Sequence, residues 1–434
     1  MMYIDNILFA IILIAGIGFF AKNVIKLKRN INLGHDVNRT DNPSARWKNM
    51  AMIALGQSKM VKRPVAGFLH IIVYAGFIII NIEVLEIIID GLFGTHRVFK
   101  DLGRFYGFLI GSFEVLAVLV LVSVIIFWIR RNIIRLKRFA NPDLKGAPKR
   151  DADTILYFEM VLMSLFLIMN STDLHFQMMN SGNVISQYIS PLFYSLDLVQ
   201  VEIIERTAWW LHIIGILVFL NYLYYSKHLH ILLAFPNTYF ADLNPKGQFD
   251  NLESVTKEVK LMMDPNADPF AAQPVDENAV PHKFGASDVQ DLNWVQLLNA
   301  YTCTECGRCT SSCPANQTGK KLSPRKIMMD TRDRLEEVGK NIDVNKGTFV
   351  PDNKSLLNDY ITPEELWACT SCNACVEECP VNISPLSIIM DMRRFLVMEQ
   401  SAAPQSLNAM MTNIENNGAP WQYNQQDRLN WKNE

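Results

Sequence analysis

Long apolar segments separated by charged loops fill the first half of the chain. The five segments span residues 4–24, 65–89, 105–129, 154–169 and 208–235. Most of them reach the ~20 residues that a helix needs to cross ~30 Å of hydrocarbon. Soluble helices carry polar stripes, which these segments lack. The pattern therefore predicts a bundle of five transmembrane helices, of which the fourth is the shortest.

Lysine and arginine gather in two of the loops that join these segments. The loops after the first and third segments are rich in both residues, whereas the loop between the fourth and fifth holds Arg206 among four acids. Because basic loops stay in the cytoplasm, the N-terminus is expected outside and the C-terminal half inside. The first segment lacks a basic leader and a small-residue cleavage site, which predicts that it is retained. We therefore expect a multi-pass protein of the cytoplasmic (inner) membrane.

The pattern changes after the fifth segment, which closes a membrane domain of residues 1–235. Residues 236–293 are rich in Pro, Asp and Asn without a long apolar run, as is typical of an irregular linker. Residues 294–400 show helical spacing around the cysteines. The polar tail of residues 401–434 contains two tryptophans, and it is expected to be disordered or to bind a partner. The predicted fold class is all-α, with a helical cytoplasmic domain beside the membrane bundle.

The overall composition hides these two halves. Charged residues make up 19%, hydrophobic residues 50%, the net charge is -2 and the mean hydropathy is +0.09. These averages exclude a disordered chain, a collagen-like chain and a strongly basic nucleic-acid binder, so no nucleic-acid partner is expected.

All eight cysteines lie beyond residue 302, in two copies of the run C-x2-C-x2-C-x3-C-P. Bacterial two-cluster ferredoxins carry this run, and the fourth Cys of each copy ligates the other cluster. The first [4Fe–4S] cluster is therefore expected on Cys303, Cys306, Cys309 and Cys379. The second is expected on Cys369, Cys372, Cys375 and Cys313. Zinc sites need only four ligands and disulfides are disfavoured in the cytoplasm, so neither explains the duplicated run.

Histidines within the apolar segments suggest a second redox centre. His70 lies in the second segment, and His212, His228 and His230 lie in the fifth. In one continuous helix, His212 and His230 would share a face about 27 Å apart, and His228 would point to nearly the opposite side. Two imidazoles on one face near the two membrane surfaces suit a pair of b-type haems, each of which needs a second ligand from a neighbouring helix. Alternatively, these imidazoles bind backbone groups or lipid headgroups.

The second and fifth segments resemble the cytochrome b subunit of respiratory nitrate reductase and the related membrane subunit of heterodisulfide reductase. His70 matches the first histidine of that family's helix-two pair, and His212 and His230 match its helix-five pair. The resemblance implies that His70 and His230 bind the haem b on the cytoplasmic side. Ile80 stands at the second helix-two position, so a second haem at His212 would need a substitute ligand. The candidates for this ligand are His96 and His175, whereas His35 and His282 are expected to be ordinary surface residues.

The cysteine half resembles the dicluster iron–sulfur subunit of heterodisulfide reductase in TECGRC, CPANQTGK and LWACTSCNAC. It is also similar to domains of succinate dehydrogenase and glycerol-3-phosphate dehydrogenase. Together the resemblances imply a heterodisulfide reductase-type fusion, which relays electrons between a (mena)quinone pool, haem b, two clusters and a separate cytoplasmic catalytic subunit. The catalytic subunits of heterodisulfide reductase carry duplicated CCG segments, which this chain lacks, so the resemblance implies a partner with CCG motifs or a flavin. This chain also shows no nucleotide loop, flavin motif or hydrolytic triad and is not expected to be catalytic alone. The alternative is a haem-free membrane anchor for a dicluster ferredoxin.

Further charged residues in or near the membrane segments are candidates for supporting roles. Four acids could form a proton route or a quinone pocket: Glu83, Glu86, Glu114 and Glu159. Glu83 and Glu86 could instead reach the outer headgroups. Three cations near the inner haem position could pair with its propionates or with lipid headgroups: Lys62, Arg63 and Lys227.

Overall fold

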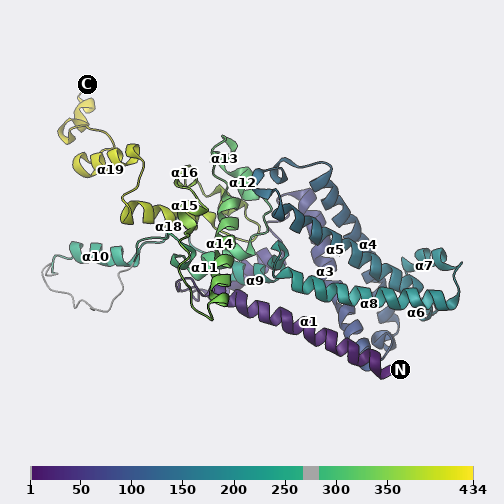
Figure 1. The fold of residues 1–434 in the computed structure, drawn as a ribbon. Helices are drawn as coiled ribbons and strands as arrows, with labels where there is room; N and C mark the ends of the chain where they lie inside the picture. Colours follow the sequence, from purple (N-terminus) through teal and green to yellow (C-terminus); the bar gives the residue numbers. More distant parts are fainter. Residues whose placement is uncertain (1, 267–282, 434) are drawn as a thin grey trace.

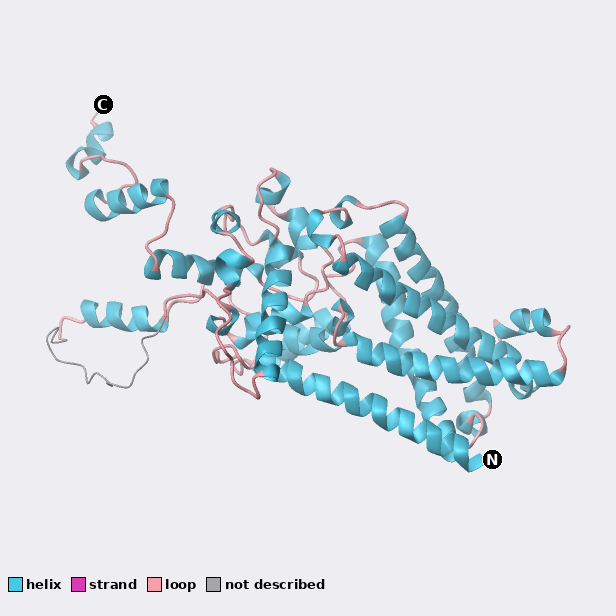
Figure 2. Ribbon diagram, viewed as in Figure 1, coloured by secondary structure: helices cyan, strands magenta, loops and turns pink. Residues whose placement is uncertain are grey.

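The chain is helical throughout the part that the structure describes. The computed structural model describes residues 2–266 and 283–433, and within these ranges every regular element is a helix, with no strand (Figure 2). The expected all-α class is confirmed. Residues 267–282 of the linker, which include His282, lie outside the described residues.

Five long helices form a bundle, side by side in Figure 1: α1 Met2–Ile31, α3 Pro64–Phe93, α4 Arg104–Asn132, α5 Ala147–Thr172 and α8 Leu198–Leu223. Their most apolar windows have mean hydropathies from 1.6 to 2.7, yet only 11% to 44% of each window is buried inside the protein. Large apolar side chains such as Ile14, Phe68 and Phe108 therefore face outward, where lipid can cover them. The predicted five membrane helices are confirmed.

Short elements, including 3₁₀ and π turns labelled η, connect the long helices: α2 Pro43–Met50, η1 Ala51–Leu55, η2 Val98–Leu102, η3 Lys137–Phe139, η4 Pro142–Leu144, α6 Leu174–Met179, α7 Ser186–Ile189 and η5 Ser190–Phe193. The elements η2, α6, α7 and η5 cap the end of the bundle where the N-terminus lies, which we call the distal end (Figure 1). The opposite end meets the cysteine-bearing domain, and we call it the junction end.

The fifth membrane helix differs from its prediction at both ends. It begins at Leu198 rather than at residue 208, because Asp197 and Gln200 form a capping box. It ends at Leu223, because Ser226 adopts an extended conformation and its hydroxyl accepts a hydrogen bond from the His228 amide. The chain then continues as η6 Lys227–Leu229 and α9 His230–Tyr239.

This break corrects two predictions. His212 and His230 do not share the face of one helix, and His212 lies in the middle of α8 rather than near a membrane surface. The His228 ring lies 5.4 Å from the His230 ring, between ring centroids, rather than on the opposite side. The continuous apolar run 208–235 concealed the break, because the change of direction depends on one hydroxyl and its hydrogen bond.

The cysteine-bearing domain is a cluster of short helices around one longer helix: α11 Trp294–Thr302, α12 Arg308–Ser312, α13 Pro314–Gln317, α14 Pro324–Val344, α15 Leu356–Asp359, α16 Pro363–Trp367, α17 Ala374–Glu378, α18 Pro385–Arg394 and η8 Phe395–Glu399, preceded by η7 Val289–Asp291. One hydrophobic core joins this domain to the bundle. It includes Leu27 of α1 and Leu223 of α8 together with Leu297, Ile327 and Ile389 of the cysteine domain. The two halves are therefore packed as one body at the junction.

Two peripheral segments project from this body in Figure 1. Helix α10 (Glu253–Met263) lies in the linker, and α19 (Gln405–Asn417) with η9 (Gln425–Lys432) forms the tail. None of these three elements has a buried residue. The polar composition of the linker and tail did not predict these helices.

Candidate redox site

The two cysteine runs fold in the same way. In each run the residues two and four positions after the first cysteine adopt a left-handed conformation: Glu305 (φ 54°) and Gly307 (φ 73°), and then Ser371 (φ 56°) and Asn373 (φ 59°). A short helix follows each turn, α12 in the first run and α17 in the second. Non-glycine residues rarely adopt positive φ, so the repeated turns indicate a shared constraint on both loops.

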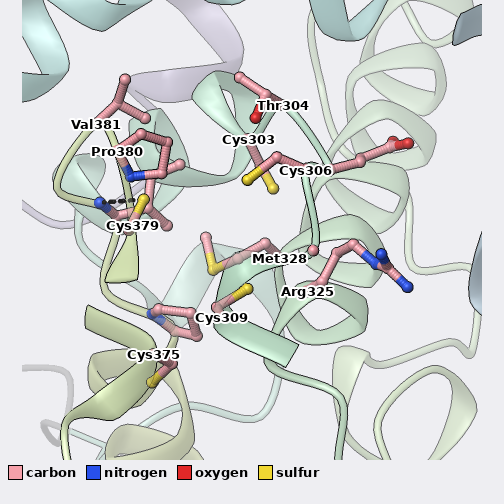
Figure 3. Close-up of a pocket in the computed structure, with 14 residues that line it drawn as sticks. Cys303, Thr304, Cys306, Cys309, Arg325, Met328, Cys375, Cys379, Pro380 and Val381 are labelled. Atoms are coloured by element: carbon pink, nitrogen blue, oxygen red, sulfur yellow. Dashed lines mark hydrogen bonds between the residues drawn. The ribbon is translucent and has the colours of Figure 1, made fainter. Parts of the chain in front are cut away.

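The structure brings together the four cysteines assigned to the first cluster. Cys303, Cys306, Cys309 and Cys379 line one small pocket, with Cys375 at its edge. Figure 3 shows the four sulfur atoms around a common space, while the sulfur of Cys375 lies farther away. Met328, Val381 and Ile383 supply apolar walls. This arrangement crosses between the runs, since Cys379 comes from the second one.

The other four cysteines form a neighbouring group. Burial raises the pKa of Cys375 to about 12, and the thiols of Cys369, Cys313 and Cys372 add to this shift. Burial likewise raises the pKa of Cys303 to about 12. These thiols would stay protonated at neutral pH unless a metal centre supplied positive charge to hold their thiolates. Cys372 is exposed, so this second group reaches the surface of the domain.

All eight cysteines are free thiols, so no disulfide joins them in the structure. The two runs supply eight thiols, twice the number of ligands that one zinc site needs, whereas two polynuclear clusters would use all eight.

Glu305, between Cys303 and Cys306, ties the first cysteine run to the membrane domain. Its buried carboxylate forms ion pairs with Lys227 of η6 and, at 2.9 Å, with Arg332 of α14. Burial opposes ionisation of Glu305, but the two cations outweigh it and lower the pKa of this carboxyl. The backbone amide of Lys227 also donates to Asp151 of α5 (3.1 Å), which fixes η6 against the bundle.

The loop before α3 is tied to the second run. Lys62 pairs with Glu377 at 2.8 Å and Arg63 with Glu378 at 3.0 Å, and both acids lie between Cys375 and Cys379. These pairs correct the expectation that Lys62, Arg63 and Lys227 meet haem propionates or lipid headgroups, because each of the three cations binds a carboxylate of the cysteine domain.

Arg308, next to Cys309, connects the first cysteine run to the loop before α3. Its guanidinium donates to the carbonyl oxygen of Lys59 at 2.9 Å. Sequence reasoning missed Arg308 together with Glu305, Glu377 and Glu378. Charged residues inside the cysteine runs were visible in the sequence, but nothing indicated their partners some 80 to 320 positions away.

His70 of α3 and His230 of α9 face each other at the junction end, with ring centroids 6.4 Å apart. Two imidazoles on opposite sides of one metal ion place their centroids about 6 Å apart, given metal–nitrogen bonds of ~2 Å. The Nδ1 atom of His230 bonds the Lys227 carbonyl oxygen at 3.1 Å, which leaves Nε2 free. The buried Nδ1 atom of His70 has no hydrogen-bond partner. The residues present therefore fit a bis-histidine haem iron.

The remaining histidines are arranged differently. The Nδ1 atom of the buried His212 bonds the Leu162 carbonyl oxygen at 3.0 Å, in the middle of α5. His96 bonds Asp173 at 3.1 Å and lies 5.7 Å from His175, between ring centroids. Leu162 and Asp173 are eleven residues apart, about 16 Å along a helix. The structure therefore brings neither substitute ligand to His212.

Comparisons with known proteins identify the cysteine half. Residues 302–383 match the family model described as a 4Fe-4S dicluster domain. A subunit of the "Ferredoxin/F(420)H(2)-dependent CoB-CoM heterodisulfide reductase" of Methanosarcina acetivorans is 34% identical over 109 residues, which cover 25% of this chain and 53% of that protein.

Two relatives match most of the chain. A "Probable iron-sulfur-binding oxidoreductase FadF" of Bacillus subtilis is 30% identical over 419 residues, covering 89% of this chain and 54% of the relative. An "EtfAB:quinone oxidoreductase" of Syntrophomonas wolfei is 24% identical over 433 residues, covering 92% and 55%. The chain thus spans about half the length of these relatives. No solved structure matches the chain significantly.

These findings define the class of protein. The five apolar helices and the dicluster domain make the chain a multi-pass membrane protein with an electron-transfer role based on 4Fe-4S chemistry. Its relatives are oxidoreductases and subunits of oxidoreductase complexes. The expected kinship with the iron–sulfur subunit of heterodisulfide reductase is thereby supported.

Proposed function

We propose that this protein relays electrons between a quinone pool in the membrane and a separate catalytic subunit in the cytoplasm. The observation that carries the proposal is the direct connection between the histidine pair and the first cysteine group. His230 follows η6, and Lys227 of η6 pairs with Glu305 between Cys303 and Cys306. A haem-free anchor would need neither the paired imidazoles nor this connection.

His70 and His230 hold one haem b in this proposal. Their ring spacing of 6.4 Å suits one iron between them, and the Lys227 carbonyl orients the His230 ring. When bound, the haem and the iron–sulfur clusters supply one-electron redox chemistry. The chain's own contribution is to bring the two ligands, from α3 and α9, together at the junction end.

The cysteines hold two [4Fe–4S] clusters in the crossed arrangement. Cys303, Cys306, Cys309 and Cys379 share one cavity, which supports the first set. The mutual influence of Cys369, Cys372, Cys375 and Cys313 supports the second. In this proposal electrons pass between the histidine pair and the first cysteine group, and then between the first group and the second, whose Cys372 is exposed.

The exposed Cys372 is the place where the catalytic partner would approach. The name of the Syntrophomonas wolfei relative supports a quinone as the membrane reactant. The heterodisulfide reductase relatives are named as subunits, which supports a separate catalytic partner. The Lys- and Arg-rich loops lie at the junction end, which supports a cytoplasmic position for the cysteine domain.

Spectral and metal analysis of the purified protein tests this proposal. We expect a b-type Soret band from one haem and about eight iron atoms per chain in the clusters. His70→Ala and His230→Ala should each abolish the band and keep the cluster iron, whereas His35→Ala, at an exposed position, should keep both. A protein without a Soret band would instead be a haem-free anchor, whereas an unchanged band in both variants would show that His70 and His230 do not hold the haem.

A further inference from the structure

The distal end of the bundle contains a buried polar network that the electron-transfer sites do not use. It consists of charged residues that are at most 6% exposed and come from α3, α4, the loop between them and the turn between α5 and α6: Glu83, Glu86, Arg97, Glu114 and Asp173. Such groups are costly in a membrane protein and therefore suggest a function.

Arg97 is the centre of this network. Its guanidinium donates to Asp173 at 2.7 Å and to Asn170 at 2.8 Å, and it lies 4.0 Å from the Phe176 ring centroid. Burial disfavours the charged guanidinium, but Asp173 outweighs this effect and raises the pKa of Arg97. Arg97 and Asp173 therefore remain a permanent ion pair.

Two acids are fully bonded to this centre. Glu86 accepts from the Tyr106 hydroxyl (3.1 Å) and from the Phe99 amide (2.9 Å). Tyr106 in turn lies 3.3 Å from Arg97. Glu114 accepts from Asn170 at 3.1 Å and from the amides of the α7 entry. The network thus reaches inward along both α3 and α4.

Glu83 is the exception, because its buried Oε2 atom has no hydrogen-bond partner. Glu83 and Glu114 each lie ten residues from the distal end of their helix, about 15 Å deep. The close contact of Gly76 with Val120 sets α3 and α4 in a register that places both acids at the same level. The charged groups acting on Glu83 are Arg97, Glu86 and Glu114. Glu83 and Glu86 therefore do not reach lipid headgroups.

A carboxylate without a partner at this depth is strongly disfavoured, and Arg97 is already neutralised by Asp173. Glu83 consequently holds a proton. Glu86 lies three residues further along α3, less than one helical turn from Glu83, and accepts from the Tyr106 hydroxyl, so it is the next group that can take up a proton toward the distal end. Arg97, paired with Asp173, donates to Tyr106 and keeps its own charge. A cross-link between helices would not need an acid that makes no bond.

We infer that Glu83 transfers protons between a quinone headgroup in the membrane and the distal side of the bundle, with Glu86 as the next proton carrier on the route. This inference rests on the proposed function. Reduction of the quinone takes two electrons from the redox centres and two protons from the route, and it yields the quinol. Oxidation of the quinol releases two electrons to the redox centres and two protons to the route.

The test uses the full-length protein in liposomes that contain menaquinone. The protein is reduced chemically, freed of reductant and mixed with these liposomes, and reoxidation of the clusters is followed optically. We expect Glu83→Gln to slow reoxidation by about 100-fold, the scale of a lost proton-transfer group. Glu83→Asp should recover part of the rate, because it restores a carboxyl group.

Glu202→Gln is the matched control, since Glu202 lies exposed near the distal start of α8. It should reoxidise at the wild-type rate, and all variants should keep the wild-type iron content and spectrum. Reoxidation of Glu83→Gln at the wild-type rate would overturn the proton route and leave the electron relay standing. A wild-type protein that menaquinone cannot reoxidise would overturn both.

Discussion

At the scale of single residues, Glu305 shows how the junction is held. Lys227 and Glu305 have side chains that are 9% and 3% exposed, and Arg332 supplies the second cation. A buried ion pair contributes little over an apolar contact, but removing one partner leaves the other charge buried without compensation. Glu305 thus matters less for the energy it adds than for the two cations that it neutralises.

Substitution of this carboxylate should therefore be costly. We expect Glu305→Gln to lower the free energy of unfolding by about 3 kcal/mol, measured by thermal unfolding in detergent. The control is Glu364→Gln, which breaks an exposed pair with Lys321 and should leave the melting temperature unchanged. Equal melting of Glu305→Gln and the wild type would show that the junction does not depend on this pair.

At the scale of helices, the packing of α3 against α4 depends on a small residue. A Cβ atom at Gly76 would lie 2.4 Å from Cγ2 of Val120, whereas one at Gly18 of α1 would meet nothing within 4 Å. Small residues let membrane helices approach closely, because lipid gives them no hydrophobic drive to associate.

Alanine should distinguish these two glycines. We expect Gly76→Ala to destabilise the bundle by about 1–3 kcal/mol through overpacking, and Gly18→Ala to have no destabilising effect. Thermal unfolding in detergent provides the comparison. If Gly76→Ala were as stable as Gly18→Ala, α3 and α4 would not pack as closely at Gly76 as described.

The helices also show what the sequence could and could not predict. The apolar runs predicted five membrane helices because each run alone exceeds or approaches the membrane thickness. The break at Ser226 was not predictable, because the predicted apolar segment continues through it. The end of α8 depends on the hydrogen bond from the His228 amide to the Ser226 hydroxyl. The grouping of the cysteines followed from local spacing, whereas the pairing of His96 with Asp173 joins residues 77 positions apart.

At the scale of the whole molecule, the core that crosses the junction makes the cysteine domain part of the membrane protein. Without bound clusters, however, few interactions stabilise the conformation of the cysteine loops. Their left-handed turns include the non-glycine residues Glu305, Ser371 and Asn373, and their cavity is lined by thiols. Bound clusters would offset the energetic cost of these backbone conformations, because the free energy of metal binding adds directly to the free energy of folding.

Removal of the clusters should therefore unfold the cysteine domain selectively. We expect oxidative destruction of the clusters followed by chelation to lower the melting temperature of this domain by roughly 10 °C or more. Circular dichroism should show that the helices of the membrane bundle persist. An unchanged transition would mean that the loops are preorganised without metal.

The central claim is that electrons pass between the quinone pool and the clusters by way of the centre held by His70 and His230. The most direct measurement is the reoxidation of chemically reduced clusters by menaquinone in liposomes, compared between the wild type and His230→Ala at equal iron content. We predict rapid reoxidation of the wild type and much slower reoxidation of His230→Ala. Equal rates in the two proteins would contradict the account.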